Sequence, residues 1–260
     1  ISRYLMRLKD KVLLITGGSG GLGSATAVRC AQEGAKPVYI AYFGSAPKAD
    51  LTARAVDEAG SAGYAVQADV RSKAEMVQIA ELIEERSGRI DGVACYAGYP
   101  MDKEIWLGDF QTLTEEQIRK PLDSDLLGSV FTAQAVLPFM LEQKAGSIVL
   151  VSSTPGLVGD TEGIPYALAK AGIANLAKCL AKMYGPSGIR INAIAPGSIA
   201  TAANLAALSG NEYELLANES SLRRFGTPLE VANLAIHLLS DESSFRTGQV
   251  AVCDGGTVFR

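Results

Sequence analysis

The chain has 260 residues, 48% of them hydrophobic, and a formal net charge of −4. This length and composition suit a globular α/β protein with a sizeable core, and the lack of a basic cluster argues against nucleic-acid binding. No apolar run is long enough to span a membrane, and the first residues lack the apolar core of a signal peptide. Four scattered cysteines without a CxxC pair favour a reducing compartment, so we expect a cytoplasmic protein. The only histidine, His237, has no neighbouring ligands, so no metal site is expected.

A glycine-rich turn follows the first predicted strand, residues 12–16. The sequence Gly17-Gly18-Ser19-Gly20-Gly21-Leu22-Gly23 leads directly into a helical pattern that runs to about Glu33. Glycines allow a tight turn and a close approach of the backbone to a pyrophosphate, which then lies at the helix N-terminus. Between the first strand and first helix of a βαβ unit, this turn predicts a dinucleotide site.

The second predicted strand, residues 38–42, ends at Tyr42 without an acidic residue. In dinucleotide-binding folds, an Asp or Glu at this point accepts a hydrogen bond from the ribose 2′-OH of NAD. Its absence, with Ser45, Lys48 and Arg54 following, favours the 2′-phosphate of NADP. The alternative is that these three are ordinary residues of a helix surface.

Two further strands are predicted between residues 64 and 98, and a long irregular segment follows them. Residues 64–67 form a third predicted strand that leads into Asp69-Val70, and a fourth strand at about 91–98 ends in an exit turn. Residues 99–113 are then irregular and predict a substrate loop, because ligands bind beyond the carboxyl ends of parallel strands. Trp106 in this loop either anchors it or contacts substrate.

A helix is predicted after the loop, with Thr114 and Gln117 forming a capping box at its start. Pro121 is predicted to interrupt it, because proline lacks the backbone donor that a helix interior needs. The helix is then expected to resume over residues 126–143, with Asp125 at its head.

A proton-transfer site is predicted around Tyr166. A buried strand over residues 147–153 ends at Ser153, and a long helix at about 166–184 carries Tyr166 and Lys170 one turn apart on one face. A phenol has a reference pKa near 10, and a neighbouring ammonium favours the phenolate. The serine can hydrogen-bond the same substrate oxygen. The alternative is a surface helix with one aromatic residue and one lysine.

The C-terminal part continues the alternation of strands and helices. A strand over residues 190–195 ends at Pro196-Gly197, and residues 198–225 predict a mobile lid with one or two short helices. A capped helix to about Ser240 and a last strand over 249–253 follow. No linker interrupts the pattern, which predicts a single doubly wound domain over residues 1–260.

The order of these motifs resembles the short-chain dehydrogenase/reductase family, including its 3-oxoacyl-carrier-protein reductases and glucose dehydrogenases, over residues 8–256. The matching pieces are Thr16-Gly17-x-x-x-Gly21-x-Gly23, Asp69-Val70, Ala97-Gly98, Ser153, Tyr166-x-x-x-Lys170, Pro196-Gly197-x-Ile199-x-Thr201 and Asp254-Gly255-Gly256. The resemblance implies a single-domain Rossmann fold, a parallel sheet of about seven strands with helices on both faces. It also implies a homotetrameric NAD(P)(H)-dependent oxidoreductase that moves a hydride between nicotinamide and a small carbonyl or secondary-alcohol substrate.

The resemblance also implies the role of each site residue. Tyr166 delivers the proton as general acid/base, Ser153 orients the carbonyl, and Lys170 binds the nicotinamide ribose. Asp69 with Val70 would hold the adenine, and Ile199 with Thr201 the carboxamide side. The cofactor is implied to contact Gly17, Ser19, Gly20, Gly21, Leu22, Gly23, Tyr42, Asp69, Val70, Ala97, Gly98, Tyr166, Lys170, Pro196, Gly197, Ile199 and Thr201.

Three departures from the family pattern stand out. Cys95-Tyr96 replaces two asparagines, Asp125 replaces a catalytic asparagine, and the segment between Gly98 and Asp125 is a few residues longer than usual. In addition, Gly20 stands where many NADP-using relatives carry arginine. We expect Asp125 either to act on Lys170 through a bridging water, at roughly 5 Å, or only to cap the helix that follows. The alternative function is a non-catalytic dinucleotide-binding regulator on the same fold.

Overall fold

The computed structural model describes residues 6–259; the first five residues, where the sequence predicts no signal peptide, and Arg260 lie outside it. The sheet consists of seven strands: β1 (Leu13–Thr16), β2 (Val38–Tyr42), β3 (Gly63–Gln67), β4 (Gly92–Cys95), β5 (Gly146–Val151), β6 (Ile189–Pro196) and β7 (Val250–Cys253). All neighbours are parallel, in the order β3-β2-β1-β4-β5-β6-β7. The predicted single-domain, doubly wound α/β fold is therefore confirmed.

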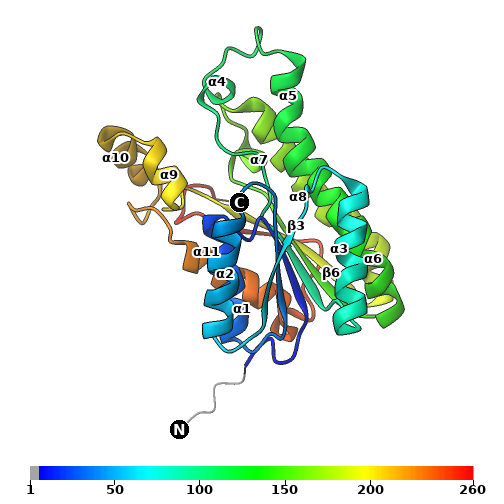
Figure 1. The fold of residues 1–260 in the computed structure, drawn as a ribbon. Coiled ribbons are helices and arrows are strands. Elements are labelled where there is room, and N and C mark those ends of the chain that lie inside the picture. The colour runs from blue at the N-terminus through cyan, green and yellow to red at the C-terminus, as the bar shows by residue number, and fades with distance from the viewer. Residues whose placement is uncertain (1–5, 260) are drawn as a thin grey trace.

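Helices cover both faces of the sheet (Figure 1). One face is covered by α1 (Gly21–Gln32), α2 (Ala46–Glu58) and α11 (Pro228–Leu239), and the other by α3 (Lys73–Ser87), α6 (Gly128–Gln143) and α8 (Ile164–Tyr184). Successive strand side chains point to opposite faces. Ile15 therefore packs under α1 and α11, while Leu14 packs under α3 and α6. Each face of the sheet thus has its own hydrophobic core, and burial on both faces stabilises the register of the strands.

Four short helices extend beyond the carboxyl edge of the sheet, in the upper part of Figure 1. They are α4 (Lys103–Trp106), α7 (Pro155–Val158), α9 (Ala202–Ala207) and α10 (Gly210–Glu219). The two helices predicted in the lid are confirmed as α9 and α10, whereas α4 is a helical turn inside the loop that the sequence predicts to be irregular. Two 3₁₀ turns, η2 (Gly185–Ser187) and η3 (Asp241–Ser243), follow α8 and α11.

The helix after the loop is continuous, so the predicted interruption at Pro121 is wrong. It consists of α5 (Glu115–Pro121), a π-helix η1 (Leu122–Leu127) and α6. Pro121 stands where the wider π turns begin, and such a change of pitch accommodates a residue without a backbone donor. The capping box of Thr114 and Gln117 is confirmed. The joined helix, Glu115–Gln143, is long and apolar enough to cross a membrane, although half of its most apolar part is buried, as in a core helix.

Candidate active site

The predicted site residues gather at the carboxyl edge of the sheet, around the boundary of β1 and β4. Thr16 and Cys95 are register partners at the ends of these two strands, and the chain leaves β1 and β4 toward opposite faces. Ligands of doubly wound sheets bind at such a switch point.

The glycine-rich turn packs directly against the exit of β4. Gly17 has φ +65°, and a Cβ there would lie 2.5 Å from the backbone nitrogen of Ala97. Gly20 precedes α1 without a side-chain cap, so the first N–H groups of the helix remain available to a ligand. A Cβ at Gly21 would lie 3.0 Å from the side chain of Thr201, at the start of α9. This backbone cradle fits the pyrophosphate of a dinucleotide.

The remaining predicted cofactor residues line the same edge. Ser19 and Leu22 are half-buried in the turn, and Gly23 is buried where α1 begins. Gly197 packs against Asp254, and Ile199 is buried beside the lid. The structure thus brings together the turn, the β4 exit and the β6 exit, as the sequence predicts.

An arginine that the sequence analysis missed lies beside Asp69, at the exit of β3. The guanidinium of Arg71 donates to both carboxylate oxygens of Asp69, at 2.6 to 3.0 Å, and lies 5.3 Å from the ring centroid of Phe43. The hydrogen bond from Arg71 holds the pKa of Asp69 below its usual value. Lys48, which the sequence favours for the 2′-phosphate, is exposed on α2. The signal for Arg71 is its place two residues after Asp69.

Val70 and Tyr42 complete this end. Val70 is buried, and a Cβ at Gly128 would lie 2.7 Å from its side chain, so the β3 exit packs tightly on the start of α6. Tyr42 is the last residue of β2 and pairs in register with Gln67. No carboxylate follows it directly, since Phe43 and Gly44 come next.

Lys170 is buried one turn from Tyr166 on α8. Its Nζ donates to the Val151 carbonyl oxygen at 2.9 Å, lies 2.8 Å from Asp125 Oδ1, and lies 5.3 Å from the ring centroid of Tyr166. Burial lowers the pKa of Lys170, but the Asp125 carboxylate and Tyr166 together outweigh it and hold the pKa above its usual value. The ammonium is therefore the stable form at neutral pH.

Asp125 contacts Lys170 directly, so its expected action on Lys170 is confirmed, while the expected bridging water and the expected helix cap are both wrong. It lies within η1 rather than at a helix start, and therefore it does not cap the following helix. Its Oδ1 pairs with Lys170 at 2.8 Å, which leaves no room for a bridging water. Its Oδ2 accepts from the backbone N–H of Tyr99 at 2.7 Å, at the start of the predicted substrate loop. One carboxylate thus joins the loop to the lysine.

Trp106 lies against Tyr166, with the two ring centroids 5.3 Å apart. Its Nε1 donates to Glu162 Oε2 at 3.1 Å, and its backbone oxygen accepts from Gly163 N at 2.8 Å. Trp106 therefore anchors the loop and also packs beside the tyrosine.

Ser153 lies just beyond the end of β5 and is buried. Its Oγ donates to the carbonyl oxygen of Pro196 at 3.3 Å. This hydrogen bond is long, and a substrate oxygen can take the place of the carbonyl oxygen as its acceptor.

Cys95 and Tyr96, which stand in place of two asparagines, face opposite sides of the sheet. Tyr96 packs beneath α1, where its hydroxyl accepts from Thr26 Oγ1 at 2.9 Å, and burial raises its pKa. Cys95 is buried on the other face, where burial raises its pKa to about 12 against the opposing effects of Thr16 and Lys170. Tyr96 therefore braces α1 from within the core.

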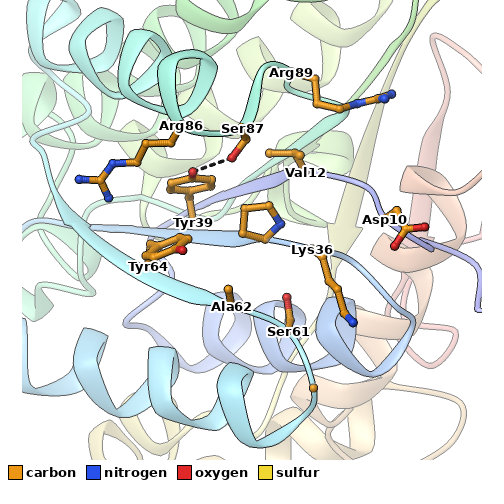
Figure 2. Close-up of a pocket in the computed structure, with 12 residues that line it drawn as sticks. Asp10, Val12, Lys36, Tyr39, Ser61, Ala62, Tyr64, Arg86, Ser87 and Arg89 are labelled. Atoms are coloured by element: carbon orange, nitrogen blue, oxygen red, sulfur yellow. Dashed lines mark hydrogen bonds between the residues drawn. The ribbon is translucent and has the colours of Figure 1, made fainter.

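A hollow of about 560 Å³ opens at the opposite edge of the sheet (Figure 2). It lies near the amino ends of β1, β2 and β3, beside Tyr39, Tyr64 and Arg86. The Tyr39 hydroxyl is hydrogen-bonded to Ser87 Oγ at 2.8 Å, and Arg86 lies over the Tyr64 ring. This hollow is separate from the candidate active site, because it lies at the amino ends of the strands and the candidate active site lies at their carboxyl ends.

Comparisons with known proteins agree with this geometry. A family model described as enoyl-(acyl carrier protein) reductase matches residues 17–258. The chain is 38% identical to the oxidoreductase UcpA of Salmonella typhimurium, covering 96% of this chain and 95% of the relative. It is 36% identical to the 3-oxoacyl-[acyl-carrier-protein] reductase FabG of Thermotoga maritima, covering 97% and 100%. It superposes on the crystal structure of levodione reductase with a TM-score of 0.87, 34% identity, and coverage of 96% and 98%. The chain therefore belongs to the short-chain dehydrogenase/reductase family, whose members are NAD(P)-dependent oxidoreductases.

Proposed function

We propose that the protein transfers a hydride between a nicotinamide cofactor and a carbonyl or secondary-alcohol substrate, with Tyr166 as general acid/base. The observation that carries this proposal is the buried Lys170 ammonium, 5.3 Å from the Tyr166 ring centroid. A fixed positive charge there favours loss of the phenolic proton during alcohol oxidation and its return during reduction.

Each residue of the proposed catalytic site has a separate role. A bound nicotinamide dinucleotide would supply or accept the hydride. Ser153 donates a hydrogen bond to the substrate oxygen, and Tyr166 exchanges a proton with that oxygen. Lys170 holds positive charge beside the tyrosine, while Asp125 and the Val151 carbonyl fix its ammonium in place.

The cradle of Gly17 to Gly23 would hold the pyrophosphate, and Asp69, Val70 and Arg71 the adenosine. NADP is the proposed cofactor rather than NAD. Two observations support it: no carboxylate ends β2, and the Arg71 guanidinium lies over Phe43, directly after β2. Planar guanidinium groups suit phosphate recognition.

We further propose a cytoplasmic homotetramer, as the family resemblance implies. Phe245 and Phe259 are largely exposed in the single chain, and burial between copies would remove their apolar surface from water. Sedimentation equilibrium at micromolar concentration tests this part independently, because a monomer would contradict it without affecting the catalytic proposal.

The catalytic proposal is tested by turnover. We expect a panel of neutral ketones, sugars and β-ketothioesters, each assayed with NADPH and NADH, to contain at least one substrate. Cofactor binding without turnover on any panel member or any corresponding alcohol would instead favour the non-catalytic regulator. The departure at Asp125 is compatible with catalysis, since Asp125 forms an ion pair with Lys170 and keeps it beside Tyr166.

A further inference from the structure

Three segments lie next to Ser153, Tyr166 and the glycine-rich turn, and we call them the mouth: residues 99–113, 155–163 and 198–225. The first contacts Tyr166 through Trp106. The second connects Ser153 to the helix of Tyr166, and the third begins beside the glycine-rich turn, where Thr201 faces Gly21. A substrate bound at Tyr166 would therefore lie next to these segments.

The mouth is strongly acidic. Its segments contain eight acidic and three basic residues, a net charge of −5, although the whole chain has only −4. One of the basic residues, Arg224, is paired with Glu230 at 2.6 Å. The neighbouring helix α5 adds no net charge, because Glu115 pairs with Arg119 and Glu116 with Lys120.

A hydrogen bond and a ring contact bring one acidic residue of the mouth near Tyr166. The Glu162 carboxylate accepts from the Trp106 indole at 3.1 Å, and that indole packs on Tyr166. Elsewhere in the mouth, hydrogen bonds from Ser209 lower the pKa of Glu212 on α10, and Lys103 lowers it further by a smaller amount. Glu162 is thus separated from Tyr166 only by the indole of Trp106.

In the part of the site described above, the catalytic centre has no unpaired positive charge that could bind an anionic substrate. The Lys170 ammonium is paired with Asp125 at 2.8 Å. The mouth also exposes large apolar side chains, among them Met101, Leu107, Phe110, Val158, Leu205 and Leu215.

From this combination we infer that the substrate is an uncharged, largely apolar ketone or secondary alcohol. The mouth disfavours substrates that carry phosphate or carboxylate groups, including thioesters held on a carrier protein by a phosphopantetheine arm. Apolar surface gains from burying an apolar ligand, while like charges around the entrance repel an anion during its approach and in the complex. This inference rests on the proposed oxidoreductase function and names the substrate class of the same site.

The test compares two matched pairs of carbonyl compounds at saturating cofactor. One pair is 4-tert-butylcyclohexanone and 4-oxocyclohexanecarboxylate, and the other is the acetoacetyl thioester of N-acetylcysteamine and that of coenzyme A. The assays are run at about 0.01 M salt, where the Debye length is about 30 Å and the repulsion between charges is only weakly screened. We expect kcat/KM for the neutral member of a pair to exceed that of the anionic member by about tenfold or more, and high salt to narrow the ratio.

Charge variants separate the mouth from the rest of the surface. Glu104, Glu214 and Glu219 lie in the mouth, and their joint replacement by Gln should raise kcat/KM for the anionic compounds severalfold at low salt. The matched control replaces three exposed glutamates of α2 and α3 by Gln: Glu58, Glu81 and Glu85. This control should leave the neutral-to-anionic ratio unchanged.

Binding provides a second readout, because Trp106 is the only tryptophan in the chain. In Tyr166→Phe with oxidised cofactor bound, the neutral ketone should change the Trp106 fluorescence at lower concentration than the anionic one. Equal or better binding and turnover of the anionic members at low salt would overturn the inference while leaving the oxidoreductase proposal intact. If no carbonyl in either pair or in the wider panel is turned over or alters the fluorescence, the oxidoreductase proposal falls and this inference with it.

Discussion

Asp125 Oδ1 lies 2.8 Å from Lys170 Nζ, and both side chains are buried. The second oxygen of the same carboxylate accepts from Tyr99 N at 2.7 Å. Asp125 therefore offsets part of the positive charge that favours the Tyr166 phenolate, and it also fixes the start of the predicted substrate loop. Buried charges of this kind are stable only when they are paired and hydrogen-bonded, as both are here.

The first prediction concerns this pair. In Asp125→Asn the carboxylate charge is lost while Tyr99 N keeps an acceptor, so the Lys170 charge acts on Tyr166 without compensation. We expect the rising limb of the pH profile for alcohol oxidation to move to lower pH, by about one unit. The pKa of Lys170 should fall, because burial is then less opposed.

The matched control is Asp123→Asn, which removes the same charge from the same π-helix without touching Lys170. Its profile should superimpose on that of the unmodified protein, measured with chemistry rate-limiting. If the Asp125→Asn profile also superimposes on it, the ion pair has no catalytic influence and serves only to hold Lys170 and the loop.

The second prediction concerns Tyr166. Replacing it with Phe removes the exchangeable proton and keeps the ring that packs on Trp106. We expect kcat to fall by about 10²-fold or more, with nearly normal cofactor affinity by equilibrium titration. Tyr64→Phe, on β3 at the far edge of the sheet, is the control and should keep full activity. Substantial turnover in Tyr166→Phe would exclude the tyrosine as the proton donor.

The third prediction concerns cofactor choice. Arg71→Ala should weaken NADPH binding by about tenfold and NADH binding much less, because it removes a guanidinium near the expected 2′-phosphate. Lys48→Ala, on the exposed face of α2, should change neither. Phe43→Asp should shift the preference toward NADH. Tighter binding of NADH than of NADPH by the unmodified protein would refute the NADP proposal.

The fourth prediction concerns the glycine-rich turn. Gly17→Ala places a side chain at φ +65° and 2.5 Å from the backbone of Ala97. The backbone conformation alone costs about 1–2 kcal/mol, and the contact adds to it, so we expect lower thermal stability together with much weaker cofactor binding. Gly44→Ala meets no atom within 4 Å and is the control. Unchanged cofactor affinity in Gly17→Ala would show that the turn does not approach the pyrophosphate.

Local patterns were enough to predict the sheet and the glycine-rich turn. The central strands are short apolar runs because both faces of the sheet are buried there, and Gly17 stands where only a residue without a Cβ fits. Features that depend on tertiary packing were missed or only partly predicted. The family resemblance places Asp125 near Lys170, but no local pattern shows that these residues, 45 positions apart, form a direct ion pair.

Three other features that were not predicted have the same origin. Pro121 locally favours a helix break, but packing of η1 and α6 against α8 and the sheet favours one continuous helix. The side of the sheet to which Tyr96 turns depends on the register of β4, which places its hydroxyl beside Thr26 on α1. Arg71 becomes a candidate only once the end of β2 is seen to lie beside it.

The π-helix η1 has a consequence for insertions and deletions in this protein. Each residue of an α-helix turns the chain by about 100°, and a π segment absorbs extra residues without lengthening the helix in proportion. Deleting one residue between Leu122 and Asp125 would let the segment relax to regular α-helix, while α5 and α6 keep nearly their present angular phase. The residues of the segment would then shift by one position relative to α8, and the carboxylate of Asp125 would point away from Lys170. A one-residue change of length here therefore acts on the Asp125–Lys170 pair, while the flanking helices keep their packing.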